Sequence, residues 1–327
     1  MNRRAGISAG GVAAALVVAA AACVAVYFAL GGWEPLRKEI APPDESLRFR
    51  KTDPALVAYV QVGQVATGMK EPAGIAVGKD GRLYVAGDSR VRLFDANGKM
   101  ESEFSTAGPP SCVAIGPDGR IYVGAGNRVE VYDANGRRQG VWDRLDPNAM
   151  ISSIAVGPRD VFLADDFSSA VLRCDLAGNV IGRIGRPDAN RDVPGILLRS
   201  PHFDVTIGPD GLLWVANPGR HLVESYTFAG EPKSSWGELS AEMPGFSGCC
   251  NPKDIAFGPD GMIVTGEKGF PRVKVYDPHG RFLSVVAGTE SFDDSAKYLD
   301  LAVDGRGRVF VLDALVSIVR VFERKKP

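Results

Sequence analysis

The sequence has no excess of either charge and very little histidine. Its 38 lysines and arginines nearly balance 39 aspartates and glutamates, and only three histidines are present. The basic residues are also dispersed along the chain, which argues against nucleic acid as a primary partner. The chain lacks a P-loop, a His-Glu-x-x-His motif and a Cys-x-x-Cys motif. The sequence signatures of nucleotide-binding enzymes, zinc proteases and thioredoxin-like proteins are therefore missing.

An internal repeat occupies most of the chain. In residues 252–286, short apolar runs alternate with turns such as Gly258-Pro259-Asp260-Gly261, and residues 272–276 alternate polar and apolar side chains. This pattern predicts a four-stranded antiparallel meander. Six copies occur, and their equivalent positions are spaced by 38, 41, 51, 50 and 46 residues. Those positions are Ala76, Ala114, Ala155, Thr206, Ala256 and Ala302. Such a period is typical of the blades of a β-propeller.

The two ends of the repeat region predict how the ring closes. The sixth copy ends at Phe322 and lacks an outer strand, whereas a spare strand-like run, residues 56–62, precedes the first copy. If this run completes blade six, the ring has no open sheet edge. The sequence therefore predicts an all-β fold, a six-bladed propeller over residues 55–327, with the first strand pairing with the last blade.

The repeat resembles that of the NHL-repeat β-propellers. The resemblance rests on Pro-Ala-Gly-Ile-Ala-Val at 72–77, Asp-Gly-Arg-Ile-Tyr-Val at 118–123 and Val-Glu-Val-Tyr-Asp at 129–133. It extends from about Leu56 to the end, and the Gly-Cys-Cys-Asn-Pro sequence at 248–252 suggests a bacterial, membrane-anchored branch. The family includes protein- and RNA-binding scaffolds and a peptide-amidating lyase, so the resemblance implies a fold more than a function.

The resemblance also implies two kinds of metal site. The amidating lyase of the family holds zinc with histidines from separate blades, whereas His202 and His221 of this chain fall in one blade, which disfavours that activity. Six-bladed propellers of the calcium-dependent lactonase type use a Glu/Asn/Asp set at the channel. Asn217, Asp254 and Asp300 could imitate that set, which makes a calcium-dependent hydrolase the third hypothesis.

The N-terminus predicts a membrane anchor. Arg3 and Arg4 precede a stretch without charge from Ala5 to Trp33, long enough to cross a bilayer. We expect residues 1–33 to be an uncleaved signal anchor with its N-terminus in the cytoplasm. Residues 34–54, rich in proline and charge, would form a tether, with the propeller on the periplasmic side of the bacterial inner membrane. A cleaved signal peptide and a lipid-modified Cys23 are the alternatives.

The adjacent pair Cys249-Cys250 is the least ordinary feature of the repeat region. It lies between the outer strand of blade four and the inner strand of blade five, on the expected channel-mouth face. In an oxidising compartment the pair could form a vicinal disulfide that braces the loop, bind copper or zinc as thiolates, or pair with other cysteines. Cys174 takes the place of an aromatic residue of other blades, so we expect it to pack in the core.

The repeat frame places further polar residues on the same face. The predicted binding residues are Cys249, Cys250, His202, His221, Asp204, Asp254, Glu267, Lys268, Asn217 and Arg220. Four of these, the two cysteines and the two histidines, are the predicted ligands of a soft metal. His279 falls in a turn on the opposite face, where we expect it to be solvated.

These observations favour a membrane-anchored, extracytoplasmic propeller that binds a protein partner or a small ligand through its channel-mouth face. The alternative is a metal- or thiol-dependent redox accessory or enzyme centred on Cys249-Cys250. An enzymatic role is the less favoured of the two, and neither the partner nor the ligand follows from the sequence.

Overall fold

The structure is a computed structural model and describes residues 51–143, 145–189, 193–293, 295–296 and 299–326. The chain divides into two units, Met1–Phe49 and Arg50–Pro327, and all described residues belong to the second. The predicted anchor, residues 1–33, and most of the predicted tether lie outside the described residues. Within the ranges that are described, no helix is both long and apolar enough to cross a bilayer.

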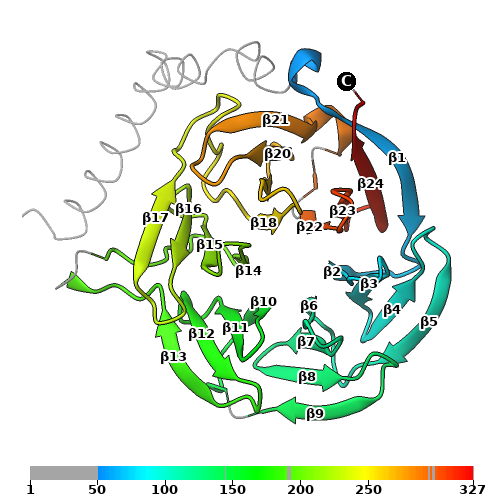
Figure 1. Ribbon diagram of the computed structural model, residues 1–327, viewed down its shortest axis with the longest axis vertical. Helices are drawn as coiled ribbons and strands as arrows, with labels where there is room; N and C mark the ends of the chain where they lie inside the picture. Colours follow the sequence, from blue (N-terminus) through cyan, green and yellow to red (C-terminus); the bar gives the residue numbers. More distant parts are fainter. Residues whose placement is uncertain (1–50, 144, 190–192, 294, 297–298, 327) are drawn as a thin grey trace, which may run out of the picture. The chain divides into compact units, whose positions relative to one another are not determined.

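Six four-stranded antiparallel sheets are arranged in a ring, so the chain is an all-β six-bladed propeller (Figure 1). Blades one to three consist of β2 (Pro72–Val77), β3 (Leu83–Gly87), β4 (Arg90–Phe94) and β5 (Met100–Ser105); β6 (Cys112–Ile115), β7 (Ile121–Ala125), β8 (Arg128–Tyr132) and β9 (Arg138–Trp142); and β10 (Ile151–Val156), β11 (Asp160–Asp165), β12 (Ala170–Asp175) and β13 (Val180–Ile184).

Blades four to six complete the ring. They consist of β14 (Val205–Ile207), β15 (Leu213–Asn217), β16 (Leu222–Tyr226) and β17 (Pro232–Trp236); β18 (Asp254–Phe257), β19 (Ile263–Gly266), β20 (Val273–Tyr276) and β21 (Phe282–Ala287); and β22 (Leu299–Val303), β23 (Val309–Asp313), β24 (Ile318–Arg324) and β1 (Tyr59–Ala66). Among the described residues, two short 3₁₀ helices, η1 (Pro54–Leu56) and η3 (Thr289–Ser291), lie outside the sheets.

The first strand of the chain is the outermost strand of the last blade. β1 pairs with β24 from Tyr59 opposite Arg324 to Ala66 opposite Ile318. The strand begins three residues later than the run 56–62 suggests, because Pro54–Leu56 forms η1 instead. The side chain of Asp53 accepts a hydrogen bond from the N–H of Ala55 at 2.9 Å and so caps that short helix.

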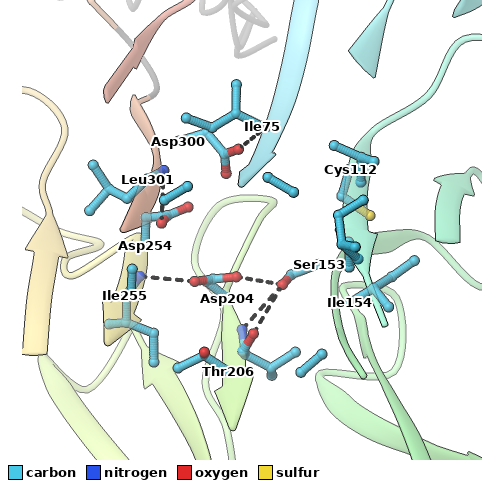
Figure 2. A pocket seen from close by; sticks show the side chains of 18 of the residues that line it. Ile75, Cys112, Ser153, Ile154, Asp204, Thr206, Asp254, Ile255, Asp300 and Leu301 are labelled. Carbon is cyan, nitrogen blue, oxygen red and sulfur yellow. Dashed lines mark hydrogen bonds between the residues drawn. The ribbon is translucent and has the colours of Figure 1, made fainter. Parts of the chain in front are cut away.

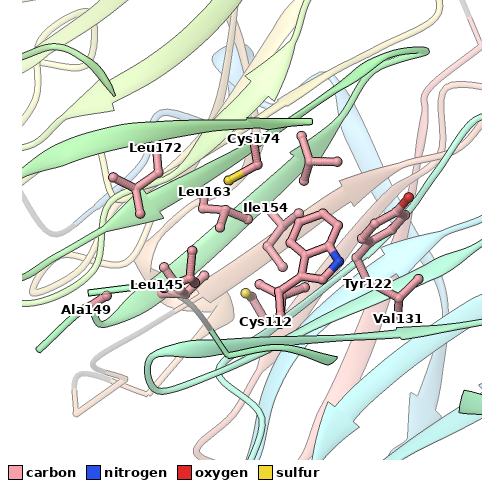
Figure 3. Close-up of a cluster of buried hydrophobic side chains, with 13 residues drawn as sticks. Cys112, Tyr122, Val131, Leu145, Ala149, Ile154, Leu163, Leu172 and Cys174 are labelled. Carbon is pink, nitrogen blue, oxygen red and sulfur yellow. The ribbon is translucent and has the colours of Figure 1, made fainter. Parts of the chain in front are cut away.

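The core lies between neighbouring blades. Second strands such as β11 are buried along their whole length, and apolar side chains of adjacent sheets pack into shared clusters. In the cluster between blades two and three, Cys174 is fully buried and Cys112 is 7% exposed (Figure 3). The expectation that Cys174 packs in the core is confirmed.

Because strands alternate in direction, the connections fall into two sets at opposite ends of the sheets. The loop face comprises the connections between second and third strands and those between blades. Within it the described residues fall in the ranges 67–71, 88–89, 106–111, 126–127, 143–150, 166–169, 185–204, 218–221, 237–253, 267–272, 288–298 and 314–317. The turn face comprises the connections from first to second and from third to fourth strands: 78–82, 95–99, 116–120, 133–137, 157–159, 176–179, 208–212, 227–231, 258–262, 277–281 and 304–308.

Candidate functional site

Three aspartates line the central channel at the starts of inner strands. Asp204, Asp254 and Asp300 border a cavity of about 320 Å³ (Figure 2). Each carboxylate accepts a hydrogen bond from a backbone N–H of the next blade. The distances are 2.9 Å from Ile255 to Asp204 and 3.2 Å from Leu301 to Asp254, and Ile75 donates to Asp300 in the same way. These aspartates therefore join blades four, five, six and one.

Burial changes the charge state of these groups. It raises the pKa of Asp204 to about 7, although hydrogen bonds from Ser153 and Ile255 oppose the shift. Burial, followed by the charge of Asp204, also raises the pKa of Asp254 well above its usual value. His202 Nε2 lies 3.7 Å from Asp254 Oδ2, and burial lowers the pKa of His202 to about 3. His202 is thus neutral at ordinary pH.

Asn217 lies away from the channel. Its fully buried amide donates to Glu224 Oε2 at 2.9 Å and to the carbonyl of Gly195 at 3.2 Å, and it accepts from the N–H of Leu197 at 2.9 Å. Asn217 therefore holds the chain that enters blade four, and it is absent from the described channel lining. A calcium site built on Asn217, Asp254 and Asp300 stays a prediction.

The cysteine pair lies on the loop face. Cys249 is exposed and Cys250 is 1% exposed. Neither cysteine is in a disulfide, and a hydrogen bond of 2.9 Å joins their sulfurs. They border a cavity of about 480 Å³ together with Lys268 and Phe270. The loop thus presents one sulfur to solvent and keeps its neighbour beneath the surface.

The loop that carries the cysteines is held by the side chain of Asn251. Its amide nitrogen donates to the carbonyls of Ser247 at 2.7 Å and Lys268 at 2.9 Å, and its oxygen accepts from the N–H of Lys268 at 2.9 Å. Three hydrogen bonds from one buried side chain satisfy backbone groups of two connections. The pair is consequently fixed to the connection between β19 and β20.

Glu267 supports the same loop from below. It is 1% exposed and accepts from both the N–H and the hydroxyl of Ser247, at 3.0 and 3.1 Å. Its carboxylate lies 2.9 Å from Arg272 Nη2 and 2.7 Å from Lys274 Nζ. Burial acts to raise the pKa of Glu267, but the charges of Lys274 and Arg272 outweigh it and the pKa is lowered. Glu267 is therefore a buried anion that holds this loop in place, and its predicted part in ligand binding stays a prediction.

Two lysines surround the buried sulfur. Lys253 Nζ donates to the carbonyls of Pro201 and His202, both at 2.6 Å, and Lys268 Nζ donates to Ser200 Oγ at 2.8 Å. Both lysines and His202 border a second cavity, of about 400 Å³. Burial, followed by the charge of Lys268, lowers the pKa of Lys253 to about 8.

The two thiols differ in acidity. Burial acts to raise the pKa of Cys250, but hydrogen bonds from Cys249 and Ser200 and the charges of Lys268 and Lys253 outweigh it, so the pKa is lowered. The hydrogen bond to Cys250, followed by burial, raises the pKa of Cys249. Because the pKa of Cys249 is raised and that of Cys250 is lowered, the proton between the two sulfurs belongs to Cys249. By contrast, burial raises the pKa of Cys112 and of Cys174 to about 12.

The structure does not gather the predicted soft-metal ligands into one group. Among the described residues, no three side chains of the types His, Cys, Asp and Glu come together as they would around a metal ion. His221 is 7% exposed, and burial lowers its pKa. Arg220 is half-buried beside it in the chain. A copper or zinc site on Cys249, Cys250, His202 and His221 thus remains a prediction, while His279 is exposed on the turn face as expected.

Sequence reasoning missed the apolar side chains of the loop face. In the part of the chain that the structure describes, six large apolar residues in loops are exposed, and all six belong to this face: Met150, Phe167, Leu197, Leu239, Leu315 and Val316. The other exposed large apolar residues of the described chain lie on outermost strands, namely Val60, Val62, Met100, Val141, Val180, Ile181 and Leu283. The repeat alignment contained the signal, because it puts apolar residues in connections where other blades have polar ones.

Comparisons with known proteins identify the fold alone. The chain matches no protein-family model and none of the curated proteins. Among solved structures it is similar to a streptogramin B lyase, with 14% identity over 82% of this chain and 98% of that one and a TM-score of 0.57. It is also similar to a protein of unknown function from Bacteroides thetaiotaomicron, with 17% identity over 82% and 76% of the two chains and a TM-score of 0.60. The virginiamycin B lyase from Staphylococcus aureus is 15% identical over 80% of this chain and 88% of that one, with a TM-score of 0.53.

Proposed function

We propose that this protein is a membrane-anchored, extracytoplasmic propeller of NHL type that binds a protein partner through its loop face. One observation carries the proposal. In the described chain every exposed large apolar residue outside the outermost strands lies on the loop face, and none lies on the turn face. Large exposed apolar patches mark protein interaction sites, and the concentration of these side chains on one face favours that face as the binding surface.

The construction of the loop face supports this role. Asn251 and Glu267 hold the loop around the cysteines through hydrogen bonds and ion pairs. Binding residues that are held in place before a partner arrives lose less conformational entropy on association. A rigid ring of blades that carries variable loops suits recognition of a protein surface.

The location and family belong to the same proposal. The uncharged stretch at residues 5–33 supports an anchor in the bacterial inner membrane, and the repeat sequence supports NHL identity. With a formal net charge of −1, the protein would not favour nucleic acid. Two of the similar structures are lyases, but identity of about 15% supports a shared fold with them and not a shared activity.

Paired variants of the full-length chain test the proposal. Phe167→Ser with Leu315→Ser removes two loop-face side chains that are 58% and 51% exposed. Ile181→Ser with Val62→Ser removes two outer-strand side chains that are 54% and 50% exposed. After cross-linking in native membranes, we expect the loop-face variant to lose a specific partner by tenfold or more.

The outer-strand variant should retain that partner at the level of the natural sequence. Equal loss in both variants, or full retention in both, would show that the loop face is not the recognition surface. Thermal unfolding of both variants controls for loss of the fold, because exposed substitutions of this kind change stability by only about 0.5 kcal/mol.

A further inference from the structure

The Cys249-Cys250 pair has a chemical role that partner binding alone does not explain. We propose that the pair is a thiol–disulfide exchange centre whose substrate is a disulfide presented at the loop face. The inference rests on the geometry of the two sulfurs and their surroundings, and it does not depend on the partner-binding proposal.

The two sulfurs have unequal access. Cys249 is exposed, whereas Cys250 is 1% exposed and lies 2.9 Å away, sulfur to sulfur. An exchange centre needs one sulfur that a substrate can reach and a second that can attack the first afterwards. The structure supplies both, since the pair is already in contact.

A cavity adjoins the accessible sulfur. Its lining includes both cysteines, the chain from Gly248 to Asn251, and Phe270 and Ala296. A volume of about 480 Å³ is large enough for the cysteine side chains and flanking backbone of a disulfide. A substrate sulfur seated there would lie against Cys249 rather than against the cysteines of the core.

The surroundings of the pair favour a thiolate at Cys250. Lys268 borders the cavity and donates from Nζ to Ser200 Oγ at 2.8 Å. Lys253 lies beneath, with its ammonium group 2.6 Å from the carbonyl of His202. No carboxylate is among the described residues that line the cavity. Positive charge close to a thiol lowers its pKa and is characteristic of reactive cysteines.

The exchange balances without a further reactant. The pair begins with one proton between its two sulfurs. Cys249 Sγ bonds to one substrate sulfur as its proton moves to Cys250 Sγ, the substrate S–S bond breaks, and one half leaves as a thiolate. Cys250 gives that proton to the departed thiolate, and Cys250 Sγ then attacks Cys249 Sγ, which releases the second half as a thiolate.

In total, two electrons pass from the pair to the substrate, which is reduced to one thiol and one thiolate, and the pair becomes a disulfide. The pair returns to its starting state by the reverse exchange, in which two thiols reduce the Cys249–Cys250 disulfide and are themselves joined as a disulfide.

The test reacts the reduced full-length chain with oxidised glutathione and follows the mass of the protein and the released thiol. We expect the protein to lose about 2 Da, to carry no glutathione, and to release both halves of the probe. Cys250→Ser should instead stop at a stable glutathione adduct on Cys249. Cys249→Ser should react at least tenfold more slowly, because Cys250 is buried.

Two control variants test whether the surroundings matter. Cys174→Ala should react like the natural sequence, since Cys174 is fully buried in the core. Lys268→Gln should slow formation of the disulfide roughly tenfold and Lys268→Arg should restore it, a rescue that a merely structural role would not predict. A stable glutathione adduct on the natural sequence, or no reaction at all, would overturn the proposal even if a variant failed to fold.

Discussion

The two faces of the propeller are built from the same strands by different means. On the turn face, one short turn recurs: Gly258 donates to the carbonyl of Met262 at 2.9 Å, while Asp260 Oδ1 accepts from the N–H of Met262 at 3.2 Å. Gly78 with Arg82, and Gly116 with Arg120, make the same backbone bond. The aspartates and glycines of these turns satisfy their own backbone.

On the loop face the connections differ from blade to blade. The connection between β3 and β4 spans residues 88–89, whereas the connection between β13 and β14 spans residues 185–204. The longer connections are held by buried side chains of other segments, such as Asn251, Glu267 and Lys253. The turn face thus depends on local sequence and the loop face on tertiary contacts. A substitution should therefore cost more on the loop face.

Glu267→Ala should give the largest difference between the faces. It would leave Arg272 and Lys274, which are 1% and 0% exposed, without their counter-ion. We expect the free energy of unfolding to fall by about 3–5 kcal/mol. On the turn face, Glu231→Ala removes an exposed ion pair with Lys233. This substitution should change the free energy of unfolding by no more than about 0.5 kcal/mol. Chemical denaturation measures both, and equal losses would contradict the comparison.

Asp204→Asn should change how stability depends on pH. The folded protein keeps the Asp204 proton up to about pH 7, whereas the unfolded chain loses it near pH 4. Asp204 therefore contributes to the free energy of unfolding at low pH, and this contribution is lost as the pH rises through about 7. The free energy of unfolding falls by at most about 1.4 kcal/mol per pH unit over this range. In denaturation measured from pH 4 to 8, the variant should show a smaller slope than the natural protein, because the raised pKa of Asp254 still contributes.

Asp95→Asn on the turn face provides the opposite case. Hydrogen bonding from the N–H of Lys99, the largest effect, lowers the pKa of Asp95, so its contribution is present above pH 4 and is lost as the pH falls below it. The two variants should thus differ from the natural protein in separate pH ranges. A common range for both would show that burial of Asp204 does not control its titration.

Asn251→Ala should have a smaller effect that is confined to the cysteine loop. It removes three hydrogen bonds between this loop and Lys268 and Ser247, and we expect a loss of about 2 kcal/mol. Amide hydrogen exchange should increase in residues 247–252 and stay unchanged in the turns. Unchanged exchange in that loop would show that Glu267 alone fixes it.

The fold followed from the sequence because the repeated turns and strands are local. Residues such as Gly258 and Asp260 form the same turn wherever the pattern occurs, so six copies predict six blades. The candidate site could be predicted from the sequence less completely. Asp254 lies at the channel mouth as its repeat position indicates, but Asn217 and Glu267, also at repeat positions, are directed into buried networks. A pattern in the sequence does not specify which distant residue a long side chain will contact in the folded protein.

Ser200, Phe270 and the exposed apolar residues lie in connections that no repeat position specifies. Their roles follow from contacts between segments far apart in the chain, such as the bond from Lys268 Nζ to Ser200 Oγ. The adjacent cysteines are evident in the sequence. The residues that surround them are not, because they come from loops that are brought into contact only by the fold. Local chemistry thus predicts the turn face well and the loop face only in part.

The strand that closes the ring imposes an order of events on biogenesis. Tyr59 finds its partner only when Arg324 has been made, so β1 must wait, unpaired, while nearly the whole chain follows it. Contacts this distant in sequence form slowly and expose strand edges meanwhile. A nascent chain that stops short of β24 leaves β1 without its partner strand and the ring open, so we expect proteases to cleave it more readily than the closed propeller.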